Sequence, residues 1–501
     1  MPEYSHPGVY IEEVSSGVRP IEGVSTSTAG FIGTTERGPL GATLVTSLRE
    51  YRDRYGGAAG ATLLPYAVHG FFENGGQRLF VARVVSASAV CASVGFGPYF
   101  SLRAVAPGAW GNRLFACIDD AVNGAPGFRL RLAYYVSESS GDPRAWFDGA
   151  AGAPTPSYAE EFDGLVLDVD LPDHFAARLA ASSLARMRRE PAAPVDAVPE
   201  YGMRRLQGGA DGAPLAAADF VGDQSATELQ GLAALATEDC LDVSLLYAPG
   251  APVEVARRLV AHCDAVRHRI AILDGPASLP AGFEPRQEIA ASSRAALYAP
   301  WLVVADLAGG GGRREVPPGG HVAGIYARTD ATRGVHKPPV NQAIAGALGL
   351  TARIDAAQQE MLSQRGVNPL REFPGRGLRV WGARTLSADP EWKYVNVRRL
   401  FIYLERSIEE GTQWAVFEPN EEHTWARMRA SIANFLRTVW RTGALLGRTE
   451  DEAFFVRCDR TTMTQNDLDN GRLICMVGAA AVRPAEFVIF RIGWRTGDGS
   501  A

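Results

Sequence analysis

The sequence predicts an α/β core, made of a parallel-rich sheet flanked by helices, with an inserted, mostly β domain and extended N- and C-terminal arms. From residue 237 onward, apolar strands alternate with amphipathic helices, which is typical of a parallel sheet covered on both faces. Residues 88–236 contain alternating strands separated by Gly- and Pro-containing turns. Both chain ends carry a short apolar strand next to a flexible joint.

The composition of the 501 residues indicates a multidomain globular protein, with 46% hydrophobic and 21% charged residues. A net charge of −6 argues against a dedicated nucleic-acid binder. No apolar run approaches the length of a membrane span, and the opening MPEYSHPGVY has no signal-peptide pattern. The six cysteines form no CxxC pair, which favours free thiols in a reducing cytoplasm. We therefore expect a soluble protein made inside the cell, without nucleic-acid partners or membrane insertion.

The first part of the core, residues 23–87, is expected to contain two short helices and a buried strand. The helix over 46–57 begins with a capping box, SLRE, and ends at glycines. The helix over 63–76 has apolar residues at helical spacing, and a buried type of strand follows at 78–85.

The inserted region is expected to be mostly β, with one amphipathic helix over 174–189. After it, the α/β pattern consists of a helix over 252–268 among strands at 241–250, 269–276 and 295–306.

The last quarter is expected to be mainly helical and to close with strands. A helix over 395–411 has Asn396 as its N-cap. A longer helix over 421–447 carries a stripe of apolar residues, and two strands follow at 453–459 and 472–480.

The passage that most suggests a binding site is 316–341, because it combines glycines with the basic residues Arg328, Arg333 and Lys337. Glycine backbone amides and basic side chains can bind an anion such as phosphate. The passage matches neither GxxxxGKS nor a strand-linked GxGxxG. We favour an ordered connecting loop and keep an anion-binding module as an alternative.

A hydrolase is a second alternative, because Asp274, His321 and Ser292 or Ser293 could form a triad in an α/β fold. The sequence has no GxSxG elbow, and Asp274 at a strand end more simply caps the next turn.

Metal binding is not expected, because the eight histidines are dispersed. His262 and His268 lie six residues apart and face different sides of a helix.

Four arginines form a basic flank on the helix over 421–447: Arg427, Arg429, Arg437 and Arg441. They form either a solvated face or a surface that docks onto an acidic partner. The sequence leaves both interpretations open.

The two chain ends carry strands that have no evident partner. In the strand over 7–14, Val9 and Ile11 share one face and Tyr10 lies on the other. In the strand over 486–494, apolar residues occupy both faces at first and then one face, namely Phe487, Val488, Ile489, Phe490, Ile492 and Trp494. An unpaired apolar strand is prone to aggregate, so we expect a partner strand.

Several long motifs resemble the tail sheath proteins of contractile phages and of related contractile injection systems. The likeness is strongest in PGRGLRVWGARTL (374–386), YVNVRRLFIYLERSI (394–408), WAVFEPNEEHTW (414–425) and RPAEFVIFRI (483–492). The resemblance is also present in the segments HPGVYIEEVSSGVRPIEGVSTSTAGFIG, FFENGGQRLFVARVV and PGAWGN. The resemblance implies the core fold called subtilisin-like, no enzyme activity and no cofactor.

The resemblance also implies how the chain is divided. It gives an N-terminal linking arm (1–22), a first core part (23–87), an inserted outer domain (88–236), the core with a tube-proximal C-terminal domain (237–480) and a C-terminal linking arm (481–501). The arms are expected to join a sheet in neighbouring copies, as in β-augmentation.

The implied function is mechanical: a sheath of stacked hexameric rings polymerises around an inner tube and contracts to drive that tube through a target envelope. The implied partners are further copies of the chain, the inner tube protein, and baseplate and terminator proteins. Assembly is expected in the cytoplasm, in a phage tail or tail-like particle. The four arginines listed above are then expected to face the tube.

Overall fold

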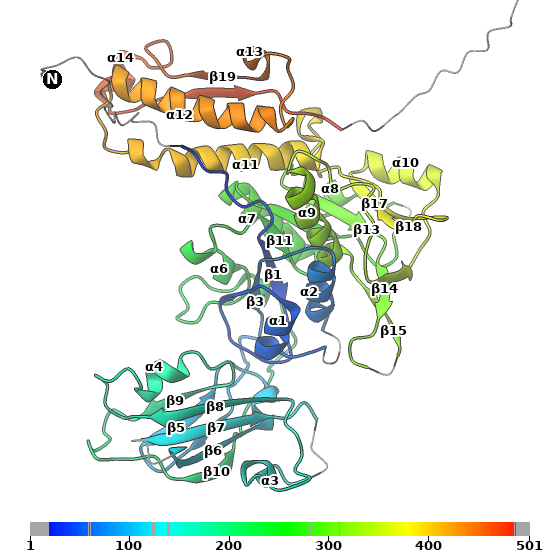
Figure 1. Cartoon of the computed structure of the whole chain (residues 1–501). Helices are drawn as coiled ribbons and strands as arrows, with labels where there is room; N and C mark the ends of the chain where they lie inside the picture. Colours follow the sequence, from blue (N-terminus) through cyan, green and yellow to red (C-terminus); the bar gives the residue numbers. More distant parts are fainter. Residues whose placement is uncertain are drawn as a thin grey trace, which may run out of the picture. The chain divides into compact units, whose positions relative to one another are not determined.

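The computed structural model describes residues 20–58, 60, 62–122, 127–137, 141–280, 282–309, 311–484 and 486 (Figure 1). The strand expected over 7–14 lies outside the described residues, and so does the strand over 486–494 except for Glu486. The chain divides into two compact units. We call residues 25–333 with 339–395 the core unit, and the segments 1–24, 334–338 and 396–501 the C-terminal unit.

The core unit is built on an eight-stranded sheet in the order β18-β17-β13-β12-β11-β1-β3-β2. The six inner strands are parallel, and β2 and β18 pair antiparallel at the two edges. This confirms the expected parallel-rich α/β core. The strands are β1 (Ala29–Gly33), β2 (Ala42–Val45), β3 (Leu79–Arg83), β11 (Leu245–Tyr247), β12 (Ile270–Asp274), β13 (Ala295–Ala299), β17 (Val367–Phe373) and β18 (Gly377–Val380).

Helices cover both faces of this sheet, so its strands are apolar on both sides. Neighbouring residues of β1 show this, because Phe31 packs into one buried cluster and Ile32 into another. The first cluster includes residues of α1 (Leu48–Tyr55), α2 (Leu64–Glu73) and α9 (Gly319–Arg333). The second includes residues of α6 (Gly231–Leu235) and α7 (Val253–Val266), and α5 (Ala217–Val221) packs against α6 and α7.

Local signals set the helix ends as expected. Ser47 Oγ accepts a hydrogen bond of 3.2 Å from the Glu50 backbone N–H at the start of α1. Gly56 follows the helix with φ +83°, a conformation that glycine adopts without strain.

The strand expected over 295–306 is two strands in two different sheets. It divides at Pro300, where β13 ends in the large sheet and β14 (Leu302–Ala305) begins. Strand β14 lies between β15 (Arg313–Val316) and β16 (Ala347–Leu350) in a three-stranded antiparallel sheet. Helix α10 (Ala356–Gln364) precedes β17.

Residues 93–205 form two further antiparallel sheets around one apolar cluster. The sheets have the orders β4-β5-β9 and β10-β6-β7-β8. Their strands are β4 (Ser93–Gly95), β5 (Phe100–Ala104), β6 (Leu114–Asp120), β7 (Phe128–Tyr134), β8 (Tyr158–Leu165), β9 (Ala185–Arg189) and β10 (Gly202–Arg205).

The prediction of a single helix over 174–189 is wrong. Helix α4 covers only Phe175–Leu179, and β9 follows. The Ser183 hydroxyl donates to Glu160 Oε1 at 2.6 Å, and β9 pairs with β5 along its whole length. Pairing with a distant strand therefore overrides the helical pattern of the sequence.

The C-terminal unit contains two long amphipathic helices and a small sheet (Figure 1). Helices α11 (Val395–Gly411) and α12 (Glu422–Arg441) share one buried cluster with the hairpin of β19 (Phe454–Arg457) and β20 (Met476–Ala479). The apolar stripe expected on α12 is buried, with Trp425, Ile432 and Leu436 at 2% exposure or less. In the described part of the chain, no helix is both long and apolar enough to cross a bilayer.

The expected N-cap of α11 is wrong by two residues. The helix already includes Val395, so Asn396 lies inside its first turn. The Asn396 amide instead donates to the backbone oxygens of His336 and Val482, at 2.8 and 3.3 Å. This side chain ties the segments 334–338 and 480–482 to the helix.

Candidate functional site

Asp274 lies at the carboxyl end of β12, where α/β enzymes often place functional groups. Its carboxylate accepts hydrogen bonds from the Tyr247 hydroxyl (2.9 Å), the Gly250 N–H (3.0 Å) and the Gly319 N–H (2.9 Å). Gly319 begins α9, so Asp274 fastens the start of that helix to the strand ends. Burial raises the pKa of Asp274 to about 7.

The other two members of the possible triad make no hydrogen bond to Asp274, and His321 Nδ1 is buried without a hydrogen-bond partner among the described residues. His321 is buried in the first turn of α9, and burial lowers its pKa to about 4. Its ring packs closely on Gly70 of α2, where an added Cβ would lie 2.3 Å from Nδ1. The Ser292 hydroxyl donates to Asp264 at 2.7 Å.

In the described residues, no hydrogen bond joins Asp274 and His321 to each other, or either of them to Ser292 or Ser293. The residues considered for a hydrolase therefore do not form a catalytic triad.

The passage 316–341 is mostly a helix, so the connecting loop expected there is wrong. Helix α9 occupies Gly319–Arg333, and its Gly320 and Gly324 pack against α2. A Cβ on Gly320 would lie 2.5 Å from the Ala67 Cα atom, and one on Gly324 would lie 2.4 Å from the Phe71 carbonyl oxygen. The Gly-Gly-x-x-x-Gly spacing was the available signal of a close helix crossing.

The basic residues of this passage do not support a phosphate cradle. The Arg328 guanidinium donates to the Ala343 carbonyl oxygen at 2.7 Å, and Lys337 Nζ donates to the Pro338 carbonyl oxygen at 3.1 Å. Arg333 is exposed at the end of α9. The Gly319 N–H at the start of α9 already donates to the Asp274 carboxylate, so it is not available to a bound anion.

Metal sites are also absent from the part of the chain that the structure describes: no three His, Cys, Asp or Glu side chains gather around a common point. His262 Nε2 lies 3.0 Å from a guanidinium nitrogen of Arg269, and burial together with that positive charge lowers its pKa to about 4.

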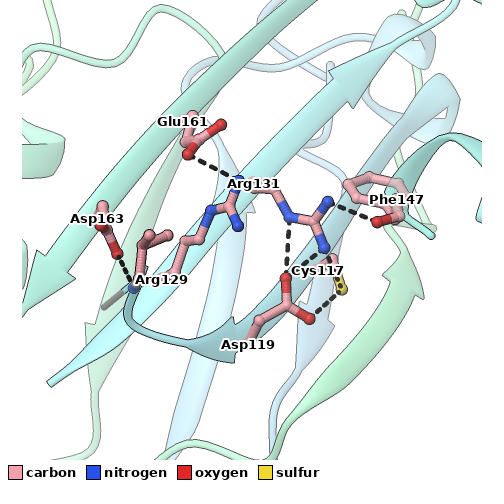
Figure 2. A network of polar contacts seen from close by, with 8 residues as sticks. Cys117, Asp119, Arg129, Arg131, Phe147, Glu161 and Asp163 are labelled. Carbon is pink, nitrogen blue, oxygen red and sulfur yellow. Dashed lines mark hydrogen bonds and ion pairs between the residues drawn. The ribbon is translucent and has the colours of Figure 1, made fainter. Parts of the chain in front are cut away.

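A polar network on β6 and β7 holds a cysteine beside charged groups (Figure 2). Asp119 accepts from Arg131 Nε at 2.9 Å and from the Cys117 thiol at 3.2 Å. Arg131 also donates to the Phe147 carbonyl oxygen at 2.6 Å, which ties helix α3 (Arg144–Phe147) to the sheet. Burial, reinforced by Asp119, raises the pKa of Cys117 to about 12, so the thiol stays protonated and is a poor nucleophile.

The four arginines of α12 have different surroundings. Arg437 forms a two-pronged ion pair with Glu450, at 2.8 and 2.7 Å. Arg429 donates to the Cys458 carbonyl oxygen, and Arg427 lies 4.5 Å from the centre of the Trp414 ring. Arg441 is exposed at the end of the helix. Contacts within the chain therefore hold three of these side chains.

The hairpin β19–β20 exposes apolar side chains on a sheet of only two strands. Phe455 is 46% exposed and Met476 is 52% exposed. Within the described residues, no third strand pairs with the outer edge of either strand. Residues 444–446 continue the pairing beyond β20, with Leu446 N–H donating to the Ala480 carbonyl oxygen at 2.7 Å.

Comparison with known proteins places this chain among sheath proteins. Residues 224–386 match the central domain of phage tail sheath proteins, and residues 387–495 match the phage tail sheath C-terminal domain. The tail sheath protein of Burkholderia phage BcepMu is 27% identical over 470 residues, which are 89% of this chain and 88% of the phage protein. The tail sheath protein of Vibrio phage KVP40 is 28% identical over 184 residues, which are 35% of this chain and 26% of the phage protein.

The fold is also similar to that of solved sheath structures. The sheath of an extracellular contractile injection system named PVC, in its contracted state, superposes with a TM-score of 0.60 at 24% identity, covering 98% of both chains. Two family models that together span residues 224–495, and a relative aligned over most of its length, agree with this fold. The chain belongs to the family of contractile tail sheath proteins.

Proposed function

We propose that this chain is a structural subunit of a contractile sheath, which polymerises helically around an inner tube and shortens to drive that tube through a target envelope. The observation that carries the proposal is the β19–β20 hairpin of the C-terminal unit, in a chain of the sheath family. A two-stranded sheet is only marginally stable in water, and its free edges accept further strands.

The donors of those strands are the two arms. The strand over 7–14 offers Val9, Tyr10 and Ile11, and the strand over 486–494 offers Phe487, Val488, Ile489, Phe490, Ile492 and Trp494. Backbone hydrogen bonds give such a contact its affinity, and alternate side chains give it specificity. Each copy gives and receives a strand, so the contact is heterologous and builds an open lattice.

Contraction then needs no bound nucleotide at the moment of firing. The extended and contracted packings differ in free energy, and the difference adds up over many subunits. In this proposal, residues 15–20 and 483–484 act as joints that let the bodies turn while the strands stay paired. Residues 478–482, which the sequence suggested as part of the second joint, are instead paired with β19 and with residues 444–446.

The partners in this proposal are further copies in stacked hexameric rings, the inner tube protein, a baseplate and a terminator. Assembly takes place in the cytoplasm, in a phage tail or tail-like particle. No nucleic acid, membrane insertion, metal or cofactor takes part.

We assign the regions of the chain on the same basis. The parallel sheet is the subtilisin-like core, formed by residues 23–87 and the core part of 237–480. Residues 88–236 are an outer insertion, and residues 93–205 carry its sheets, whereas α5 and α6 pack on the core. The arms are 1–22 and 481–501. In the tube-proximal part, Arg427, Arg429, Arg437 and Arg441 face the tube, with Arg441 the most available of the four.

Deleting residues 486–501 tests the proposal. We expect a folded, soluble monomer that no longer polymerises, because the described residues of the core and C-terminal clusters all precede residue 486. Negative-stain electron microscopy of the full chain should show striated hollow cylinders, and the truncated chain should show none. Tubes formed by the truncated protein would rule out the C-terminal arm as the connector.

A further inference from the structure

Two cysteines face each other at the loop end of the β19–β20 hairpin. The last pair in this antiparallel ladder is Arg457 with Met476, and one further step in the same register places Cys458 opposite Cys475. Both are free thiols in this structure. The hairpin therefore holds a pair of thiols on neighbouring strands, although the two residues are distant from any CxxC pattern in the sequence.

The hydrogen bonds of the hairpin determine how close the two cysteines lie. The Ala480 N–H donates to the Ala453 carbonyl oxygen at 2.9 Å, and pairs of this kind alternate with non-hydrogen-bonded pairs along an antiparallel ladder. Cys458 and Cys475 lie an odd number of steps from that pair, so they form a non-hydrogen-bonded pair. The Cα atoms of such a pair are about 4.5 Å apart. This separation is within the range of about 4.4–6.8 Å that disulfides span.

The two thiols also point to the same side of the hairpin. Both pack into the apolar cluster shared with α11 and α12, where Cys458 is buried and Cys475 is partly exposed. A hydrogen bond from Cys475 lowers the pKa of the Cys458 thiol, and the same bond raises the pKa of Cys475. Because a hydrogen bond joins the two side chains, their sulfur atoms are near neighbours. A bond between them therefore needs little movement of the backbone.

We propose that Cys458 and Cys475 form a reversible disulfide that fastens β19 to β20 when the protein passes from a reducing to an oxidising environment. The oxidant is a small disulfide such as oxidised glutathione. Cys475, the more exposed thiol, attacks it first, forms a mixed disulfide and releases one glutathione thiol. Cys458 then attacks the Cys475 sulfur, closes the Cys458–Cys475 bond and releases the second glutathione thiol. The two cysteines lose two protons and two electrons, which convert oxidised glutathione into two thiols.

The bond closes the loop over residues 458–475, which contains helix α14 (Gln465–Asp469). Closing a loop lowers the entropy of the unfolded chain and so stabilises the strands at its base. Both thiols stay reduced in a cytoplasm and are oxidised outside the cell. The formation of the disulfide follows from the register of the hairpin alone. Its use, a firmer acceptor sheet in a released particle, rests on the proposed function.

Mass spectrometry of the full, unpolymerised chain tests the bond directly. The protein is equilibrated with oxidised glutathione, its remaining thiols are blocked with N-ethylmaleimide, and it is digested with trypsin without reductant. We expect peptide 458–460 joined to peptide 473–491, and we expect dithiothreitol to separate them. Glutathione retained on Cys475, a link from Cys475 to any other cysteine, or two free thiols would each overturn the inference.

Hydrogen exchange tests whether the bond fastens the strands. Oxidation should slow exchange of the backbone N–H groups of β19 and β20 at least about tenfold, because the closed loop opposes their separation. Cys458→Ala and Cys475→Ala should each abolish this slowing. Cys91→Ala, which changes a half-buried cysteine elsewhere, is the control that should retain it.

Each variant is compared with its own reduced form, so a change in basal stability does not affect the result. A disulfide that forms without slowing the exchange would overturn the proposed fastening. Both measurements use the unpolymerised chain, so a negative result in either overturns this inference and leaves the proposed function standing. If the full chain formed no sheaths under any condition, the proposed function would fail and the disulfide would stand.

Discussion

The Tyr247 hydroxyl donates a hydrogen bond of 2.9 Å to Asp274, which links the ends of the neighbouring parallel strands β11 and β12. The same carboxylate receives the N–H of Gly319, the first residue of α9. A group that resembles a catalytic acid in the sequence therefore serves as a structural joint.

The first prediction concerns the pH dependence of this joint. Burial raises the pKa of Asp274 from 3.8 to about 7, so the folded chain holds this proton more tightly than the unfolded chain. Its contribution to stability is complete below the unfolded value and is lost as the pH rises through about 7. Thermal unfolding across this window should show a smaller fall in melting temperature for Asp274→Asn than for the natural chain. Parallel curves for both proteins would contradict this.

The second prediction concerns the crossing of α2 and α9. Gly324→Ala should destabilise the fold by about 1–3 kcal/mol, because overpacking against a backbone oxygen cannot relax by moving a side chain. The added Cβ would lie 2.4 Å from the Phe71 carbonyl oxygen. Gly349→Ala is the matched control, since its Cβ would meet Val303 at an ordinary 3.9 Å. Chemical denaturation should separate the two variants, and equal midpoints would count against a close crossing.

The third prediction concerns Arg37, a buried arginine that caps the end of α1. It donates to the carbonyl oxygens of Arg52, Asp53 and Arg54, at 3.1, 2.8 and 3.0 Å. Its guanidinium also lies 4.4 Å from the centre of the Tyr158 ring.

Arg37→Lys should lower the free energy of unfolding by at least about 2 kcal/mol, because an ammonium group cannot serve three carbonyl groups and a ring together. Arg49→Lys, on the exposed face of α1, should change it little. A fully stable Arg37→Lys variant would show that the three bonds contribute nothing measurable.

The fourth prediction concerns sheath–tube docking. Arg441→Gln should weaken docking more than Arg437→Gln, because Arg437 already pairs with Glu450 whereas Arg441 is exposed. The difference in docking between the Arg441→Gln variant and the unchanged chain should become smaller as salt is added, since salt screens exposed charges. Co-sedimentation of sheath with tube at two ionic strengths measures this, with Arg178→Gln in α4 as the control. Unchanged docking of Arg441→Gln would contradict a tube-facing role.

Sequence reasoning succeeded where a signal was local and strong. Ser47 caps α1 and the apolar stripe of α12 is buried, as predicted, although Glu50 completes the cap on Thr46 and not on Ser47. It failed at Gly320 and Gly324, because glycines that permit close helix packing look the same in a sequence as glycines of a loop. It also failed at β9, whose partner strand β5 lies more than 80 residues earlier.

The sequence alone determined the elements that depend on periodicity and capping, and its long motifs indicated the sheath family. Strands that are buried on both faces and helices with one apolar stripe need no knowledge of their neighbours to be recognised. Only the tertiary structure decided that Asp274 accepts a hydrogen bond from the start of α9, that Glu450 forms an ion pair with Arg437, and that the Phe417 side chain is exposed to solvent. Each of these features depends either on residues distant in the chain or on the backbone angle of a single residue. Such dependence produces no periodic pattern in the sequence, so sequence reasoning cannot detect it.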